Sequence, residues 1–242
     1  MQCLINPKRE KGEPLLSGPV LFYLNPGEAS RAGHLAKQLG GKRQFMFNSN
    51  LWGVSGDNGP FYVCGPAVGA PMAVLVLEKL IALGGKQVIV CGTCGSLSND
   101  LAIGDVLLPD GALNEEGTSQ HYPLAERPAV PRSLVDLLSN FLKSAGIPWC
   151  TGPLWTTDAP YRETIDKVRK YQKSGLLGVD MEFSALLTVA AYRRIELAAV
   201  MVISDQVRNE HWQSGFQDSV FKKRMRLVSL GLIDYLRQGE EK

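Results

Sequence analysis

The sequence predicts an α/β fold in which helices cover both faces of a central sheet. Short apolar runs that suit strands alternate along the chain with segments of helical period. Two of these runs, 87–91 and 198–203, are continuously apolar, which is typical of strands covered on both faces. The chain has 242 residues, 45% of them hydrophobic and 21% charged, which suffices for one substantial core. We therefore predict a three-layer α/β/α sandwich around a mixed, largely parallel sheet.

The chain is expected to form one domain behind an N-terminal arm. Residues 1–18 are polar and are interrupted by two prolines and two glycines. Such a segment stays poorly ordered unless it packs against the rest of the protein. Residues 19–242 contain no internal repeat, low-complexity tract or linker, so we assign them to a single domain.

Each element follows from a local pattern. Strands are predicted at 19–24, 61–64, 87–91, 104–109 and 198–203. Helices are predicted at 30–39, 70–83, 131–145, 161–173, 181–194 and 216–236. Ser30 is the expected N-cap of the first helix, and Gly84 is expected to end the second. The glycine-containing segment 92–96 is expected to form a turn or a ligand-binding loop after its strand.

Composition and charge argue against several classes of protein. The formal net charge is +2, and the one basic cluster, 222–226, lies in an amphipathic segment, so a solvated helix face explains it better than a nucleic-acid surface. No apolar run reaches the roughly 18 residues that span a bilayer. Five cysteines, an odd number, and the lack of an apolar leader favour the reducing cytoplasm. Cys91 and Cys94 have no partner residues that would complete a zinc site, so no metal is expected.

Two segments have the features of anion-binding sites. In 25–31 a turn leads into a helix, and Arg31 follows Gly27 by four residues. The N–H groups of a helix start and the fork of an arginine both attract phosphate or carboxylate groups. In 92–96 the glycines allow close approach of the backbone and Thr93 offers a hydroxyl. Common scaffolding with a surface Arg31 is the alternative for 25–31, and a tight structural turn is the alternative for 92–96, so both interpretations stay open on the residues alone.

Two carboxylates near the ends of predicted elements suggest catalysis. Glu182 begins a helix, where the macrodipole would keep it ionised and ready to accept hydrogen bonds from hydroxyls such as those of a ribose. Asp205 follows an apolar strand, where desolvation would raise its pKa and let it hold a proton. Helix capping is the structural alternative for each. If both groups face one small ligand, the protein is an enzyme.

Four motifs in this order resemble the nucleoside phosphorylase family, which includes purine nucleoside phosphorylases and uridine phosphorylases. They are Gly27 with Arg31, Gly-Thr-Cys-Gly at 92–95, Val-Asp-Met-Glu at 179–182, and Ser-Asp at 204–205. The resemblance implies cleavage of the N-glycosidic bond of a nucleoside by inorganic phosphate, giving free base and (deoxy)ribose 1-phosphate without a cofactor. It also implies a part in nucleotide salvage and a homo-oligomer, either a dimer or a hexamer of dimers.

The resemblance implies a role for each motif. Gly27, Arg31 and Thr93 would bind phosphate, and Met181 and Glu182 would bind the ribose. These five residues would form the sugar and phosphate half of the site. A phosphate beside the anomeric carbon would stabilise the positive charge that develops there when the bond breaks.

The base half is implied by a second set of residues. Asp205 would protonate the leaving base, and Cys94, Gly95 and Tyr161 would contact it. Pro160 stands where purine enzymes usually place an aromatic side chain, so Trp155 and Trp212 are alternatives to Tyr161 for stacking. The Ser-Asp pair at 204–205 resembles the purine enzymes, whereas 116–122 resembles the uridine branch. We expect a purine nucleoside, with uridine as the alternative.

One departure from the family pattern affects the nucleophile. The arginine that phosphorylases usually carry two residues before the Gly-Thr motif is Val90 here. Arg162 and Arg208 are candidates to replace it. A nucleosidase, in which water replaces phosphate, is therefore an alternative, although Arg31 argues for phosphate because a buried guanidinium needs an anionic partner. A nucleoside-binding protein without catalysis is a further alternative.

Overall fold

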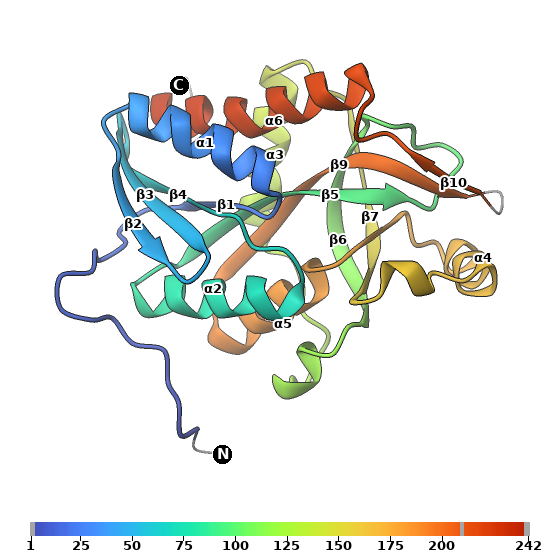
Figure 1. Ribbon diagram of the computed structural model, residues 1–242, viewed down its shortest axis with the longest axis horizontal. Helices are drawn as coiled ribbons and strands as arrows, with labels where there is room; N and C mark the ends of the chain where they lie inside the picture. Colours follow the sequence, from blue (N-terminus) through green and yellow to red (C-terminus); the bar gives the residue numbers. More distant parts are fainter. Residues whose placement is uncertain (1–2, 209–210, 240–242) are drawn as a thin grey trace.

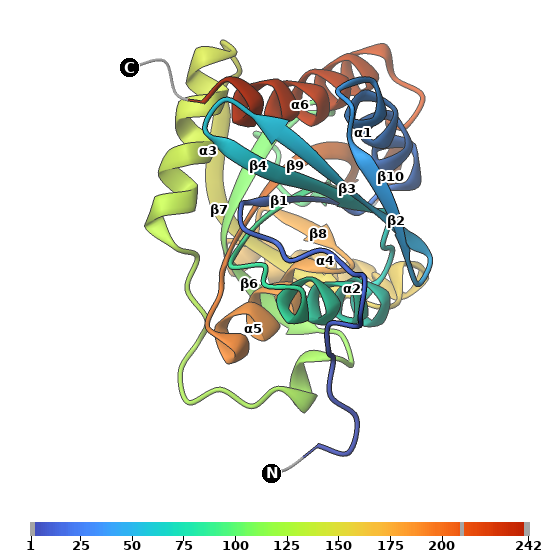
Figure 2. The ribbon, with the colours of Figure 1, turned by 90° about the vertical axis from the view of Figure 1, so that its left-hand side faces the viewer.

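The computed structural model describes residues 3–208 and 211–239 and has a central sheet between two layers of helices (Figure 1). One face of the sheet is covered by α1 (Pro26–Gln38), α3 (Arg132–Ser144) and α6 (Ser219–Gln238). The other face is covered by α2 (Ala70–Ala82) and α5 (Phe183–Arg193). The same two layers lie on opposite sides of the sheet in the view turned by 90° (Figure 2). The predicted α/β/α class is confirmed.

The strands of the described chain form one mixed sheet. Its order is β10-β9-β6-β7-β8-β5-β1-β4-β3-β2. The strands are β1 (Val20–Tyr23), β2 (Lys42–Met46), β3 (Ser49–Gly56), β4 (Gly59–Gly65), β5 (Gln87–Ser96), β6 (Val106–Glu115), β7 (Trp149–Thr157), β8 (Gly178–Asp180), β9 (Glu196–Arg208) and β10 (His211–Ser214). The central strands β4, β1, β5 and β9 pair in parallel. Since β5 also pairs with β9, the strands β5, β9, β6, β7 and β8 close into a ring.

An apolar cluster fills the space on each face of the sheet. Along β1, Val20 and Phe22 join the cluster under α2 and α5, whereas Leu21 and Tyr23 join the cluster under α1, α3 and α6. The alternation along β5 also separates the two thiols of the Cys-x-x-Cys pair, because Cys91 and Cys94 belong to opposite clusters. Both are free, and burial raises the pKa of each thiol, so they are protonated at neutral pH.

Several predicted boundaries were wrong. Helix α1 begins at Pro26 with Asn25 as its N-cap, a turn before Ser30, because a proline at the first position is already fixed in helical φ. Segment 92–96 is not a loop but the end of β5, and it pairs with β9 and β8. Residues 160–162 form a short 3-10 turn, and α4 (Ile165–Lys173) begins after it. The strands β2, β3, β7, β8 and β10 were not predicted.

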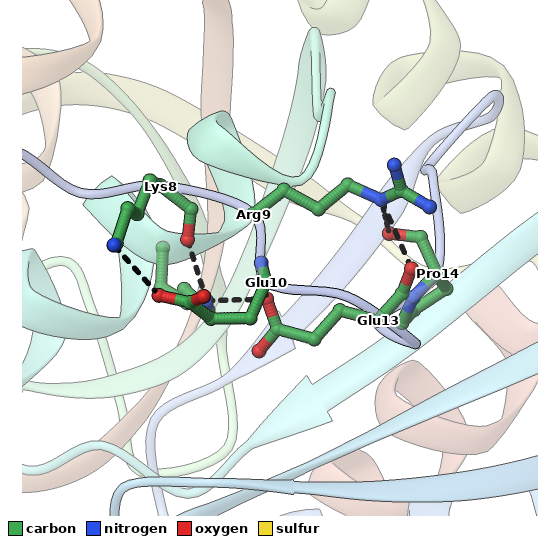
Figure 3. Close-up of polar contacts among 6 residues, drawn as sticks. Lys8, Arg9, Glu10, Glu13 and Pro14 are labelled. Atoms are coloured by element: carbon green, nitrogen blue, oxygen red, sulfur yellow. Dashed lines mark hydrogen bonds and ion pairs between the residues drawn. The ribbon is translucent and has the colours of Figure 1, made fainter.

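The N-terminal arm packs against α2 through polar contacts. The ammonium group of Lys79 lies 2.6 Å from the carboxylate of Glu13 and donates to the carbonyl of Lys8 at 2.7 Å. Within the arm, Arg9 donates to the carbonyl oxygens of Glu13 and Pro14 (Figure 3). None of the helices in the described ranges is long and apolar enough to cross a membrane.

Candidate active site

A cavity of about 530 Å³ opens where the carboxyl ends of β1, β5 and β9 meet the start of α5. Ligands of open α/β sheets bind outside the carboxyl ends of the strands, so this is the expected place for a site. The lining residues are Leu24, Asn25, Val68, Thr93, Cys94, Gly95, Pro160, Tyr161, Glu163, Val179, Asp180, Met181, Glu182, Ser204, Asp205, Val207, Trp212 and Phe216. Four of them are carboxylic acids, and none is a lysine or an arginine.

The cavity brings together most of the residues that the motifs singled out. Those that line it are Thr93, Cys94, Gly95, Tyr161, Met181, Glu182 and Asp205. The expected phosphate residues Gly27 and Arg31 are the exceptions, because they lie in the first two turns of α1, outside the lining. The residues predicted to bind the sugar and the base therefore all line one cavity. Of the predicted phosphate residues, only Thr93 lines it.

Glu182 is held by the start of a helix other than its own. It occupies the N-cap position of α5 but makes no side-chain cap there. Its carboxylate instead accepts the backbone N–H of Gly69, the N-cap residue of α2, at 2.5 Å. The turn at Gly69 requires a φ of +84°, which glycine adopts without strain. The start of α2 thus holds the carboxylate of the residue that begins α5.

Asp180 fills the capping role that the sequence suggested for Glu182. Its Oδ2 accepts the backbone N–H groups of Phe183 at 2.6 Å and of Glu182 at 3.1 Å. Its Oδ1 accepts the hydroxyl of Thr156 at 2.6 Å. Asp180 therefore fixes the backbone at the start of α5 and so positions the side chain of Glu182.

The prediction that the helix dipole keeps Glu182 ionised was wrong. Burial, and next the charge of Asp180, raise the pKa of Glu182 well above its ordinary value of 4.5. Burial likewise raises the pKa of Asp180. The hydrogen bond from Gly69 acts in the opposite direction but does not outweigh desolvation of a side chain in a residue that is only 7% exposed. These two acids therefore retain their protons to a higher pH than carboxyl groups usually do.

Asp205 is fixed by hydrogen bonds to both of its oxygens. The Ser204 hydroxyl donates to Oδ1 at 2.6 Å, and the indole Nε1 of Trp212 in β10 donates to Oδ2 at 2.9 Å. Gly95 in β5 packs directly against the same carboxyl, because a Cβ at this position would lie 2.9 Å from Oδ2. The carboxyl plane is thus set by three elements of the sheet.

The aromatic residues that the sequence suggested for stacking on the base differ in position and exposure. Trp155 is fully buried outside the cavity and donates its indole N–H to Glu115. Tyr161 lines the rim of the cavity but is fully exposed. Trp212 lines the cavity beside Asp205, and Phe216, which the sequence did not single out, lines it as well. Tyr161, Trp212 and Phe216 are therefore the aromatic side chains that line the cavity.

Thr93 and Asn25 are polar residues of the cavity lining that contact each other. The Asn25 amide donates to the Thr93 hydroxyl at 3.3 Å, while Asn25 Oδ1 is buried and has no hydrogen-bond partner in the described chain. A buried acceptor without a partner is costly, so Asn25 Oδ1 is available to accept a hydrogen bond from a ligand. The sequence placed Asn25 in a turn and gave no sign of this.

Arg31 is paired within the chain. Its guanidinium forms an ion pair with Glu28, one turn earlier in α1, and its side chain is half-exposed. Glu28 therefore supplies the anionic partner of Arg31, so the guanidinium does not require a phosphate. Val90 is fully buried in the apolar cluster under α2, so no cation replaces the usual arginine there. Of the other candidates, Arg162 is exposed and does not line the cavity, and the side chain of Arg208 lies outside the described residues.

Comparison with known proteins shows to which superfamily the chain belongs. The model of the phosphorylase superfamily matches residues 35–234, so the chain belongs to that superfamily. Among curated relatives, the guanosine phosphorylase of Halorubrum lacusprofundi is 28% identical over 183 residues, covering 74% of this chain and 75% of the relative. The DeoD-type purine nucleoside phosphorylase of Clostridium novyi is 28% identical over 215 residues, covering 85% and 91%.

Solved structures have the same fold. The purine nucleoside phosphorylase of Toxoplasma gondii in complex with immucillin-H superposes with a TM-score of 0.80 at 21% identity, covering 98% of this chain and 97% of that chain. The uridine phosphorylase of Vibrio fischeri superposes with a TM-score of 0.77 at 20% identity, covering 91% and 92%. At these identities the likeness concerns the fold alone.

Proposed function

We propose that the protein is a nucleoside phosphorylase that cleaves the N-glycosidic bond of a purine nucleoside with inorganic phosphate, releasing the base and a pentose 1-phosphate. The observation that carries this proposal is the presence of Glu182, Asp205 and Thr93 in the lining of one cavity of about 530 Å³. The relatives named as purine nucleoside and guanosine phosphorylases support the choice of a purine.

Each end of the cavity suits one part of the reaction. Met181 and Glu182 bind the ribose, with the Glu182 carboxylate facing its hydroxyls. Asp205 delivers a proton to the departing base, and its hydrogen bonds to Ser204 and Trp212 hold the carboxyl in one orientation. Positive charge on the sugar and negative charge on the base develop together, so groups at both ends stabilise one transition state.

The phosphate half requires one local rearrangement. Thr93 already lines the cavity, whereas Arg31 is engaged by Glu28 beside Gly27. Binding of phosphate would exchange the carboxylate of Glu28 for a phosphate oxygen on the same guanidinium. The half-exposed position of Arg31 leaves its side chain free to turn.

A phosphate-independent nucleosidase is the second candidate. The ion pair between Glu28 and Arg31, together with Val90 in the apolar core, favours it because both reduce the positive charge available to phosphate. A panel of inosine, guanosine, adenosine and uridine, assayed with and without phosphate, separates the candidates. Phosphate-dependent release of purines supports the phosphorylase. Equal rates without phosphate would establish the nucleosidase, and turnover of uridine alone would refute purine specificity.

The compartment, the oligomeric state and the biological role of the protein belong to the same proposal. Five cysteines without a disulfide among the described ones fit the cytoplasm, where thiols stay reduced. We further propose a homo-oligomer with a role in nucleotide salvage, because members of this superfamily borrow site residues across an interface. Sedimentation of the purified protein measures the oligomer directly, and a strictly monomeric active enzyme would refute it.

A further inference from the structure

The cavity contains a carboxyl group, Glu163, to which the motifs assign no role. Glu163 lies between the 3-10 turn 160–162 and α4, is half-buried, and lines the cavity together with Asp205. No hydrogen bond or ion pair within 3–208 and 211–239 engages its side chain. Its carboxyl is therefore free to meet a ligand, in contrast with Asp205, whose two oxygens are both occupied.

The surroundings of Glu163 suit the edge of a planar base. Pro160, Val207, Trp212 and Phe216 line the same cavity and supply apolar and aromatic surface. A flat ring between such walls exposes its polar edges only in its own plane. If one edge meets Asp205, a second acid in the cavity is available for another edge.

We propose that Glu163 determines which purine is accepted, by hydrogen bonding to the edge of the base that Asp205 leaves free. This inference rests on the proposed phosphorylase function. An ionised carboxylate accepts the N1–H and 2-amino groups of guanine through its two oxygens. A protonated carboxyl donates to N1 of adenine and accepts from its 6-amino group. The ionised form, which has no donor for N1 of adenine, thus favours guanine, whereas the protonated form admits adenine.

Both states of Glu163 are populated near neutral pH. Burial, and next the charge of Asp205, raise the pKa of Glu163 to about 7. The other titratable groups of the cavity are Asp180 and Glu182 at the start of α5 and Cys94 in β5, with Tyr161 from its own segment. Among the described residues that line the cavity there is no lysine or arginine, so none of them holds Glu163 ionised.

The test is the ratio of kcat/KM for guanosine to that for adenosine between pH 6 and pH 8. Effects of pH on Asp205, on phosphate and on stability are common to both substrates and cancel in the ratio. If each protonation state accepts one base only, the ratio rises about tenfold per pH unit. Glu163→Gln, whose amide matches the hydrogen-bonding pattern of the protonated acid, should favour adenosine with a ratio that no longer depends on pH.

Matched controls isolate the effect. Asp166→Asn changes an exposed carboxylate three residues away and should leave the pH profile of the ratio as in the wild type. Binding of adenine and guanine, followed by calorimetry at pH 6 and pH 8, provides the same comparison without turnover, so the inference is tested even if phosphorolysis fails. A ratio that is constant with pH in the wild type, or that still varies with pH in Glu163→Gln, would overturn it.

Discussion

The indole Nε1 of Trp212 donates a hydrogen bond of 2.9 Å to Oδ2 of Asp205. The two residues lie on the neighbouring antiparallel strands β10 and β9, where Trp212 pairs with Val207 and Asp205 with Ser214, and both line the cavity. Trp212 is itself 65% exposed, so its place in the structure is not explained by burial in the core. The contact positions the residue to which we assign protonation of the base.

Trp212→Phe keeps an aromatic ring but removes the donor. We expect kcat for purine nucleosides to fall by about ten- to a hundredfold, because a hydrogen bond to a charged group contributes about 1.5–3 kcal/mol. Steady-state kinetics with inosine measures the change. Trp149→Phe, a surface tryptophan in β7, is the matched control and should have wild-type kcat. Equal kcat in Trp212→Phe and the control would show that the indole does not orient Asp205.

Gly95→Ala tests the packing behind Asp205. The added Cβ would lie 2.9 Å from Oδ2 of Asp205 and 3.2 Å from Val179, so the carboxyl has to move. A displacement of this kind in a reacting group costs up to about a hundredfold in rate. Gly111→Ala in β6 is the matched control, because a Cβ there meets no atom within 4 Å. Full kcat in Gly95→Ala would show that close packing at Gly95 does not fix the carboxyl of Asp205.

Glu28→Gln tests the competition for Arg31. The amide keeps the shape of the side chain but removes the charge that pairs with the guanidinium. We expect the KM for phosphate to fall about two- to fivefold, since a partly exposed ion pair contributes up to about 1 kcal/mol. Initial rates at varied phosphate concentration measure this, with Glu13→Gln in the arm as a control. A higher KM for phosphate in Glu28→Gln would mean that Glu28 assists rather than blocks the anion.

The raised pKa of Glu182 predicts how stability depends on pH. The folded protein holds the proton of Glu182 at a pH where the unfolded chain, with a pKa near 4.5, has released it. The contribution of Glu182 to the free energy of unfolding is therefore fully present below pH 4.5 and is lost as the pH rises through the folded-state pKa. Glu182→Gln should thus gain melting temperature relative to the wild type from pH 5 to pH 9.

Thermal melts of the unliganded protein across this range measure the difference. The exposed Glu126→Gln is the control and should follow the wild type at every pH. A gap between wild type and Glu182→Gln that stays constant with pH would show that Glu182 is ionised in the folded state throughout.

Much of the fold could be predicted because apolar periodicity reports burial directly. The continuous runs at 87–91 and 198–203 became the paired parallel strands β5 and β9. The strands that escaped prediction carry weaker signals. β10 is exposed at every position and β8 has three residues, so their pairing depends on partners far away in the sequence.

The site was predictable where a residue lies at the end of a buried strand or helix, as Glu182 and Asp205 do. What the sequence could not reveal is which partner each side chain chooses. Glu182 binds the start of α2 rather than capping α5, and Arg31 pairs with its neighbour Glu28. The segment with Glu163 reads as the start of an exposed helix, and only the fold turns this residue into the cavity.

The most direct test of the central claim is ³¹P NMR of the protein with inosine and inorganic phosphate. The phosphorylase account predicts that the phosphate signal converts to that of a sugar 1-phosphate, in amounts equal to the hypoxanthine released, and that Asp205→Asn abolishes the conversion through kcat. Release of hypoxanthine with free ribose, while the phosphate signal stays unchanged, would contradict it.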